Sequence, residues 1–144
     1  MIRKSTARWQ GDGRTGKGAL SVQSGAFTDH PYSFKARFES EDGKAGTNPE
    51  ELLGAAHAGC FAMALSIALT EAGFVPDELR VTAAVEIGKV GDGFAITNIA
   101  LELEGRVPKI DRAKFEQLAK AAKDGCPLSK ALAATPITLS AKLV

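Results

Sequence analysis

The chain has 144 residues, of which 44% are hydrophobic and 24% are charged, and its formal net charge is +1. This composition is typical of a globular protein, and the length fits a single domain spanning residues 1–144. The charges are interspersed and form no basic stripe, which argues against nucleic acid as a partner. No apolar run of the signal-peptide type opens the chain, so we expect a cytoplasmic protein.

The first third of the chain predicts three strands, over residues 5–10, 18–27 and 32–39. In the third, apolar and polar residues alternate, which is typical of a half-buried strand. Arg37 belongs to the polar set of this alternation. It is therefore expected on a solvated strand face.

The longest helix signal covers residues 47–75. Asn48 can cap the first turn, Pro49 suits the first helical position, and Gly73 suits the left-handed conformation that ends many helices. Glu50 follows in the first turn, where an acidic side chain complements the helix dipole.

This helix is apolar nearly all round, and such a helix must be buried. Polar and small residues interrupt the apolar run, which favours a core helix over a membrane span; they are Gly54, His57, Gly59 and Ser66. One sheet face cannot cover such a helix, so we expect it also to pack on its own copy in a homodimer. In the competing interpretation, a second helix covers the remaining face in a monomer.

The rest of the chain predicts a hairpin, two helices and a final strand. Because hairpins dominate, the expected class is α+β, with antiparallel sheets packed around the long central helix. The strands are expected near residues 81–87, 94–107 and 137–143, and the helices near residues 111–125 and 127–133.

Two cysteines in a chain of this kind indicate free thiols or a redox pair. Cys126 precedes Pro127 at the start of a short helix, where backbone N–H groups should lower its pKa. Cys60 lies in the middle of the apolar helix, where burial should raise its pKa. It is either inert packing or a protected reactive centre that needs a cation. Arg37 is the better supplier than Lys35, because its charge is permanent and its donors form a fork.

Metal binding is not expected. The two histidines, His30 and His57, and the two cysteines could formally make a tetrahedral zinc site, but no pair has the short ligand spacing of such sites. No metal or other cofactor is therefore predicted, and His57 is expected to lie in the core or at an interface.

Several motifs together resemble the OsmC/Ohr family, and within it the OsmC branch of osmotically inducible peroxidases. The similarity extends from near Ser5 to the last strand. The motifs are Ala7-Arg8-Trp9-Gln10-Gly11, Ser24-Gly25, Arg37-Phe38, Gly46-Thr47-Asn48-Pro49-Glu50-Glu51-Leu52, Ala55-Ala56-His57-Ala58-Gly59-Cys60-Phe61-Ala62-Met63-Ala64-Leu65-Ser66 and Cys126-Pro127-Leu128-Ser129-Lys130.

The resemblance implies a thiol peroxidase that acts on hydroperoxides, preferably organic ones, in oxidative and osmotic stress defence. It implies an intertwined homodimer with active sites at the subunit interface. Cys60 would be the peroxidatic cysteine and Cys126 the resolving one, with a disulfide between them, and Arg37 and Glu50 would assist the reactive thiol. An external dithiol would complete turnover; lipoylated proteins serve in relatives, and nothing in this sequence selects the reductant.

The implied roles reverse the ranking of the two thiols that electrostatics alone suggests. An arginine over Cys60 would stabilise the thiolate and the charge that develops on the peroxide oxygens. Glu50 would orient Arg37 by a bidentate pair. The apolar surroundings of Cys60 would accommodate the alkyl part of an organic hydroperoxide.

One geometric difficulty follows from the helix. Ten residues separate Glu50 from Cys60, which is about 15 Å along a straight helix. We therefore expect either a break near Gly54 or Gly59 or a site shared across the subunit interface.

Two other functions fit parts of the sequence. The first is a non-catalytic dimer that binds small hydrophobic molecules and uses Cys60 only as packing. The second is an enzyme for thiol–disulfide exchange on proteins, although such enzymes normally carry Cys-x-x-Cys, which is absent here.

Overall fold

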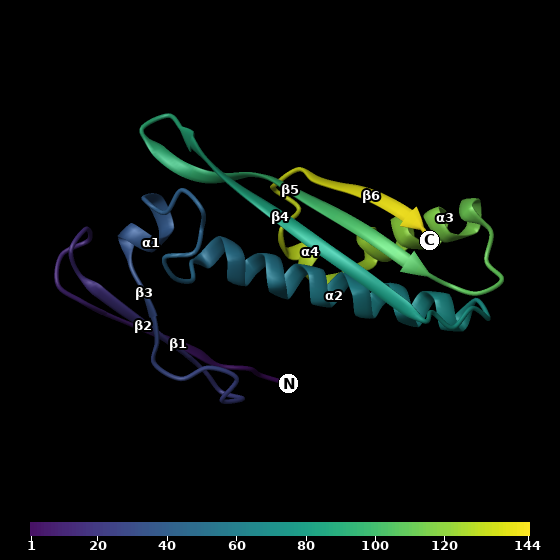
Figure 1. The fold of residues 1–144 in the computed structure, drawn as a ribbon, viewed down its shortest axis with the longest axis horizontal. Coiled ribbons are helices and arrows are strands. Elements are labelled where there is room, and N and C mark those ends of the chain that lie inside the picture. The colour runs from purple at the N-terminus through teal and green to yellow at the C-terminus, as the bar shows by residue number, and fades with distance from the viewer. The chain divides into compact units, whose positions relative to one another are not determined.

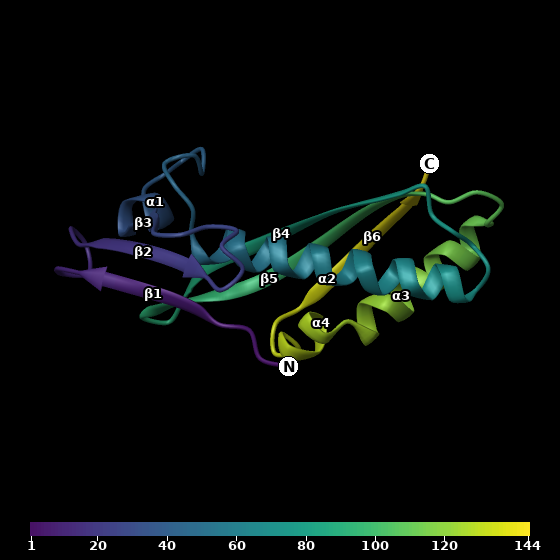
Figure 2. The same ribbon diagram turned by 90° about the horizontal axis from the view of Figure 1, so that it is seen from below.

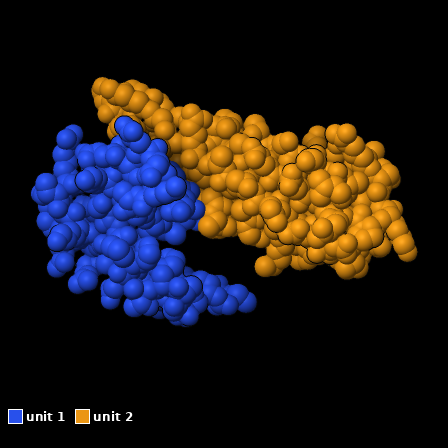
Figure 3. All heavy atoms as spheres, in the orientation of Figure 1, with its two compact units in different colours: residues 1–52 blue, residues 53–144 orange.

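The longest element is α2, Pro49–Glu71, a continuous helix of 23 residues. It belongs to a computed structural model that describes residues 1–144 (Figure 1). Two compact units are present, residues 1–52 and 53–144 (Figure 3), and each is described by itself. The other elements are β1 Ser5–Gln10, β2 Lys17–Val22, β3 His30–Tyr32, α1 Phe34–Phe38, β4 Glu78–Val90, β5 Gly93–Arg106, α3 Arg112–Gly125, α4 Pro127–Ala131 and β6 Ile137–Leu143.

The first unit is built on the antiparallel sheet β1-β2-β3. Trp9 and Tyr32 meet over this sheet with ring centroids 5.4 Å apart. A Cβ on Gly18 would lie 2.2 Å from the Tyr32 ring, so only glycine lets the ring cross the strand here. The second strand ends at Val22, and the chain turns through Gly25, whose φ is +75°.

The expected strand over residues 32–39 is wrong: most of this segment forms the short helix α1. The Ser33 side chain caps the helix by accepting from the Ala36 N–H at 3.1 Å. Phe34 and Phe38 lie one turn apart, with ring centroids separated by 4.9 Å. Apolar residues at every second position also include a pair four residues apart, so the alternation fits a helix turn as well as a strand.

The second unit contains the sheet β4-β5-β6, with β4 and β5 paired as an antiparallel hairpin. Strand β6 runs parallel to β5, with pairs from Ile99↔Ile137 to Gly105↔Leu143, so the expectation of purely antiparallel sheets is wrong here. The reason is the crossover through α3 and α4, which returns the chain to Ile99, in the middle of β5, before β6 begins. These helices and the residues of α2 from Leu53 onward lie on one face of the sheet (Figures 1 and 2).

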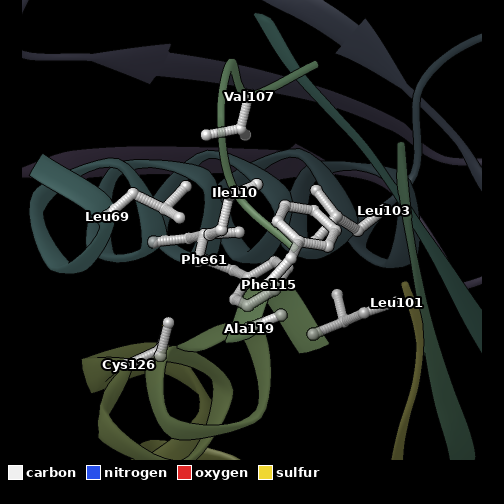
Figure 4. Packing of buried hydrophobic residues seen from close by; sticks show 11 residues of the cluster. Phe61, Leu69, Leu101, Leu103, Val107, Ile110, Phe115, Ala119 and Cys126 are labelled. Atoms are coloured by element: carbon white, nitrogen blue, oxygen red, sulfur yellow. The ribbon is translucent and has the colours of Figure 1, made fainter. Parts of the chain in front are cut away.

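The core of the second unit lies between this sheet face and the helices (Figure 4). Burying a large apolar side chain completely contributes roughly 1.5–3 kcal/mol, so the fully buried residues fix α2 and α3 against the sheet. They include Phe61, Leu65, Leu69, Ile99 and Phe115.

Only one stripe of α2 is buried within a single chain. Ala55, Ala56 and Gly59 are exposed, as are Met63 at 67% and Ile67 at 53%. By length and composition α2 is apolar enough to cross a membrane, but its opposite stripe packs in the core of the second unit. The expectation of all-round burial is therefore wrong for one chain, and the exposed apolar stripe remains to be covered.

Both ends of α2 have the expected caps. The Asn48 side chain accepts from the Glu51 N–H at 2.8 Å. The carboxylate of Glu51 accepts from the Thr47 hydroxyl at 2.9 Å. At the other end Gly73 has φ +88°, and the Phe74 N–H donates to the Leu69 carbonyl at 2.9 Å.

Gly105→Ala should destabilise the second unit. A Cβ at this position would lie 2.4 Å from Cζ of Phe115, whose ring is fully buried in the core and would have to shift. We expect a loss of about 1–3 kcal/mol in the free energy of unfolding, measured by chemical denaturation. Gly93→Ala on the same strand is the control, because nothing lies within 4 Å of its added Cβ. Equal stability of the two variants would contradict this account.

Candidate active site

Two free thiols meet inside the second unit. The Sγ atoms of Cys60 and Cys126 lie 3.0 Å apart, although 66 residues separate them in the sequence. Cys60 is carried by the middle of α2 and is partly exposed, whereas Cys126 is 0% exposed. A disulfide needs about 2.05 Å between the sulfurs, so only a small movement separates this contact from a covalent bond.

Cys126 occupies the junction of two helices. Its N–H donates to the Ala122 carbonyl at 2.9 Å at the end of α3. Its backbone is extended, with φ −59° and ψ 127°, and Pro127 then begins α4. A proline at the first helical position and an extended residue before it are the expected pattern of a helix start. This junction points the thiol of Cys126 towards α2.

The pKa of Cys126 is lowered despite its burial. Burial by itself raises the pKa of this thiol, but hydrogen bonding with the Cys60 thiol favours the thiolate and opposes it. The backbone N–H and the hydroxyl of Ser129, and the Leu128 N–H, act in the same direction. The start of α4 therefore favours negative charge on Cys126, as the sequence predicts.

The pKa of Cys60 is raised. Burial is the largest cause, and the hydrogen bond and charge of Cys126 add to it, while the Leu128 N–H works against it. This direction also agrees with the sequence prediction. Within the second unit the thiolate is thus favoured on Cys126, and ionising Cys60 requires an additional positive charge.

A second contact between α2 and α4 lies beside the thiols. Nε2 of His57 is 2.8 Å from the Ser129 hydroxyl oxygen, and both residues are buried. Burial lowers the pKa of His57, so its imidazole is neutral at pH 7. His57 is thus a core histidine, one of the two positions that the sequence predicts. Sequence reasoning misses Ser129, although a helix that starts after Cys126 brings the residue one turn later back to the same side.

Arg37 and Glu50 form a bidentate ion pair in the first unit. Arg37 Nε donates to Glu50 Oε2 at 3.2 Å, and Arg37 Nη2 donates to Oε1 at 2.6 Å. Glu50 is only 8% exposed, and the guanidinium carbon of Arg37 lies 4.9 Å from the centroid of the Phe38 ring. The expected bidentate pair is confirmed, and the expected solvated strand face for Arg37 is wrong, because α1 turns this side chain towards α2.

An aromatic pocket of about 130 Å³ opens beside this ion pair, within the first unit. Its walls combine aromatic rings with one guanidinium, a lining that suits an apolar group carrying a polar end. The main contributors are Trp9, Tyr32, Phe34, Phe38 and Arg37.

Helix α2 has no break at either glycine, so that part of the sequence prediction is wrong. Gly54 instead allows close packing, because a Cβ there would lie 3.0 Å from the Ala83 carbonyl oxygen. Gly59 faces open space on the exposed stripe, with nothing within 4 Å of an added Cβ.

The family model for OsmC-like proteins matches residues 41–142. The chain belongs to the OsmC-like family. It is 52% identical over 141 residues to peroxiredoxin OsmC of Escherichia coli (strain K12), covering 98% of this chain and 96% of that protein. The organic hydroperoxide resistance protein of Xanthomonas axonopodis pv. citri (strain 306) is 37% identical over 90 residues, covering 62% of this chain and 61% of that protein.

Among solved structures, the organic hydroperoxide resistance protein OhrB of Bacillus subtilis aligns with a TM-score of 0.70 and 28% identity, covering 100% of this chain and 98% of that one. The resemblance to the OsmC/Ohr family is thus confirmed. So is an α+β fold with two sheets and a long helix, which this OsmC-like chain shares with its structural neighbours.

Removing one thiol should change the pKa of the other, and the direction of the change should differ between the two cysteines. Cys126→Ala removes a hydrogen bond and a charge that raise the pKa of Cys60, so this pKa should fall. Cys60→Ala removes the hydrogen bond that favours the Cys126 thiolate most, so the pKa of Cys126 should rise. The pH dependence of thiolate ultraviolet absorbance in each single-thiol protein measures both values. A rise for Cys60 or a fall for Cys126 would refute the coupling.

Proposed function

We propose that this chain is a thiol-dependent hydroperoxide reductase, which reduces organic hydroperoxides and, less well, hydrogen peroxide in oxidative and osmotic stress defence. The observation that carries the proposal is the 3.0 Å contact between two free thiols of unequal exposure. The identity of 52% over nearly the whole chain to a protein named peroxiredoxin OsmC supports it. So does the similarity to a protein named for organic hydroperoxide resistance.

The unequal exposure of the two cysteines supports a different role for each in this proposal. Cys126 has the lower pKa but is 0% exposed, so a peroxide has no access to it. Cys60 is partly exposed and can meet the substrate. Cys60 is therefore the peroxidatic cysteine in this proposal, and Cys126 is the resolving cysteine. Access to the substrate decides which cysteine reacts with the peroxide. The lowered pKa of Cys126 favours its later attack on oxidised Cys60.

The reaction follows from these roles. The Cys60 thiolate attacks one peroxide oxygen, the O–O bond breaks, and the departing alkoxide takes a proton to become an alcohol. Cys60 is left as a sulfenic acid, which Cys126 attacks to form a disulfide with release of water. An external dithiol reduces this disulfide by exchange. We propose a lipoylated protein as the dithiol, on the family resemblance.

Arg37 and Glu50 complete the proposed site. Burial holds Cys60 in its neutral form, and a guanidinium that approached it would favour the thiolate and the charge developing on the peroxide. Glu50 holds that guanidinium by two hydrogen bonds. The aromatic pocket beside Arg37 suits the alkyl part of an organic hydroperoxide.

We further propose that the site is shared across a homodimer. The exposed apolar stripe of α2 needs a cover, and its small residues allow a second helix to approach closely. Since α2 is unbroken, Arg37 and Glu50 of one subunit are proposed to serve Cys60 of the other. We also propose that the protein acts in the cytoplasm, with neither membrane nor nucleic acid as a partner.

Peroxidase activity should depend on each site residue in a different way. The assay measures consumption of cumene hydroperoxide in the presence of a dithiol donor. Cys60→Ser should lower the rate of hydroperoxide consumption to the background without enzyme, and Arg37→Ala should lower this rate roughly 10²–10³-fold. Cys126→Ser should complete the first oxidation and then accumulate over-oxidised Cys60. Ser140→Ala, on an exposed position of β6, is the matched control. Full activity of Cys60→Ser would refute the proposal and favour the non-catalytic binder.

Mixed dimers test the shared site. Alone, a chain with Arg37→Ala should be nearly inactive and a chain with Cys60→Ser inactive. Their mixed dimer, in the proposed arrangement, pairs an intact Arg37 with an intact Cys60 across the interface. Random mixing should restore about one quarter of wild-type activity, since half the dimers are mixed and each has one complete site. No recovery in verified mixed dimers would show that Arg37 and Cys60 act within one chain.

A further inference from the structure

The Ser129 hydroxyl stands between two partners. It lies 2.8 Å from Nε2 of His57, and it favours the Cys126 thiolate by hydrogen bonding. A serine hydroxyl has a single hydrogen to donate. Because a thiolate has none, the Ser129 hydrogen must point to Cys126 when Cys126 is ionised, and Ser129 must then accept from His57.

This requirement fixes the tautomer of His57. Its imidazole is neutral, because burial lowers its pKa, so only one ring nitrogen carries hydrogen. If Nε2–H donates to Ser129, then Nδ1 is unprotonated. Nδ1 is buried and has no hydrogen-bond partner. An N–H at that position would be a buried donor without an acceptor, which native structures rarely tolerate. Both observations select the Nε2–H tautomer.

The four side chains therefore form two parallel contacts between the same two elements. Helix α2 supplies His57 and Cys60, one turn apart, and the start of α4 supplies Ser129 and Cys126. We propose that His57 and Ser129 are a positioning pair for the resolving step: His57 holds the Ser129 hydroxyl, and this hydroxyl donates to the Cys126 sulfur that attacks the Cys60 sulfenic acid. This inference rests on the proposed peroxidase function.

The step that this pair assists is the formation of the Cys60–Cys126 disulfide. Cys126 loses its proton, its sulfur forms the bond to the Cys60 sulfur, and the S–OH bond of the sulfenic acid breaks. The departing hydroxide takes up a proton and leaves as water. The Ser129 hydrogen stays on its oxygen throughout, so the pair keeps the attacking sulfur ionised and aimed and is not consumed.

Other charges near Cys126 do not replace this pair. On α2 the titratable groups beside it are Cys60 and His57 themselves. At the end of α3, Lys123 and Asp124 pair with each other at 3.4 Å and offset one another. The thiolate of Cys126 therefore depends on neutral donors, and Ser129 is the side-chain donor among them besides Cys60.

The first arm of the experiment measures ionisation without any peroxide chemistry. In a Cys60→Ser background, thiolate absorbance gives the pKa of Cys126. Ser129→Ala should raise this pKa by about one unit, the size expected for losing a hydrogen bond to a charged group. His57→Leu should raise it as well, whereas His57→Gln should preserve it, because the glutamine amide can donate from nearly the same place.

The second arm separates the two steps of the reaction. Proteins that keep both cysteines are mixed with one equivalent of cumene hydroperoxide. The reaction is quenched at successive times, and the intact mass of the protein is measured by mass spectrometry. Ser129→Ala should leave sulfenic acid formation within about twofold of wild type and slow disulfide formation about tenfold at neutral pH. His57→Gln should be faster in the second step than His57→Leu. Ser140→Ala and His30→Gln, at exposed positions, are the controls.

The outcomes distinguish the inference from the function beneath it. If no sulfenic acid forms on Cys60 of the wild-type chain, the peroxidase proposal fails. The pKa of Cys126, measured without peroxide, still tests whether His57 and Ser129 act on this thiol. If Ser129→Ala leaves both the pKa of Cys126 and the rate of disulfide formation unchanged, the positioning role is overturned. It is also overturned if thermal stability and both reaction steps fall together, because that pattern marks a purely structural contact.

Discussion

The structure depends on one constraint: two thiols lie in contact, one fully buried and the other only partly exposed. Burial disfavours a thiolate at either sulfur, so every negative charge in this place needs a specific donor. Cys126 obtains its donors from the start of α4, from Ser129 and from Cys60 itself. Cys60 has only the Leu128 N–H in its favour, and its pKa is raised. The need for a cation at Cys60 follows directly from the apolar helix that carries it.

Helix α2 serves three purposes with different faces. Its buried stripe, with Phe61, Leu65 and Leu69, anchors the second unit. Cys60 lies beside that stripe, where it reaches Cys126 and still remains partly exposed. The exposed apolar stripe, with Met63 and Ile67, calls for a second copy of the chain. In a single chain one stripe of α2 is therefore packed and the other is open, which fits the homodimer proposed above.

Local signals in the sequence predict most elements but not the contacts between them. Asn48 and Gly73 fix the ends of α2, because caps depend on near neighbours. The strand expected at Phe34 and Phe38 fails because their spacing fits a helical turn equally well. The parallel pairing of β6 and the Cys60–Cys126 contact depend on a crossover that no local pattern encodes. Charge singles out Arg37 as the cation that Cys60 would need, whereas only the motif resemblance points to Glu50.

The central claim is that Cys60 and Cys126 of one chain are the two partners of the redox cycle. Peptide mapping after one equivalent of cumene hydroperoxide, with free thiols blocked before digestion, tests it most directly. We expect a Cys60–Cys126 link within a single chain in most molecules, because the two sulfurs already lie 3.0 Å apart there. Disulfides between chains would contradict the claim. So would an oxidised Cys60 in chains whose Cys126 is still a free thiol and is therefore labelled by the blocking reagent.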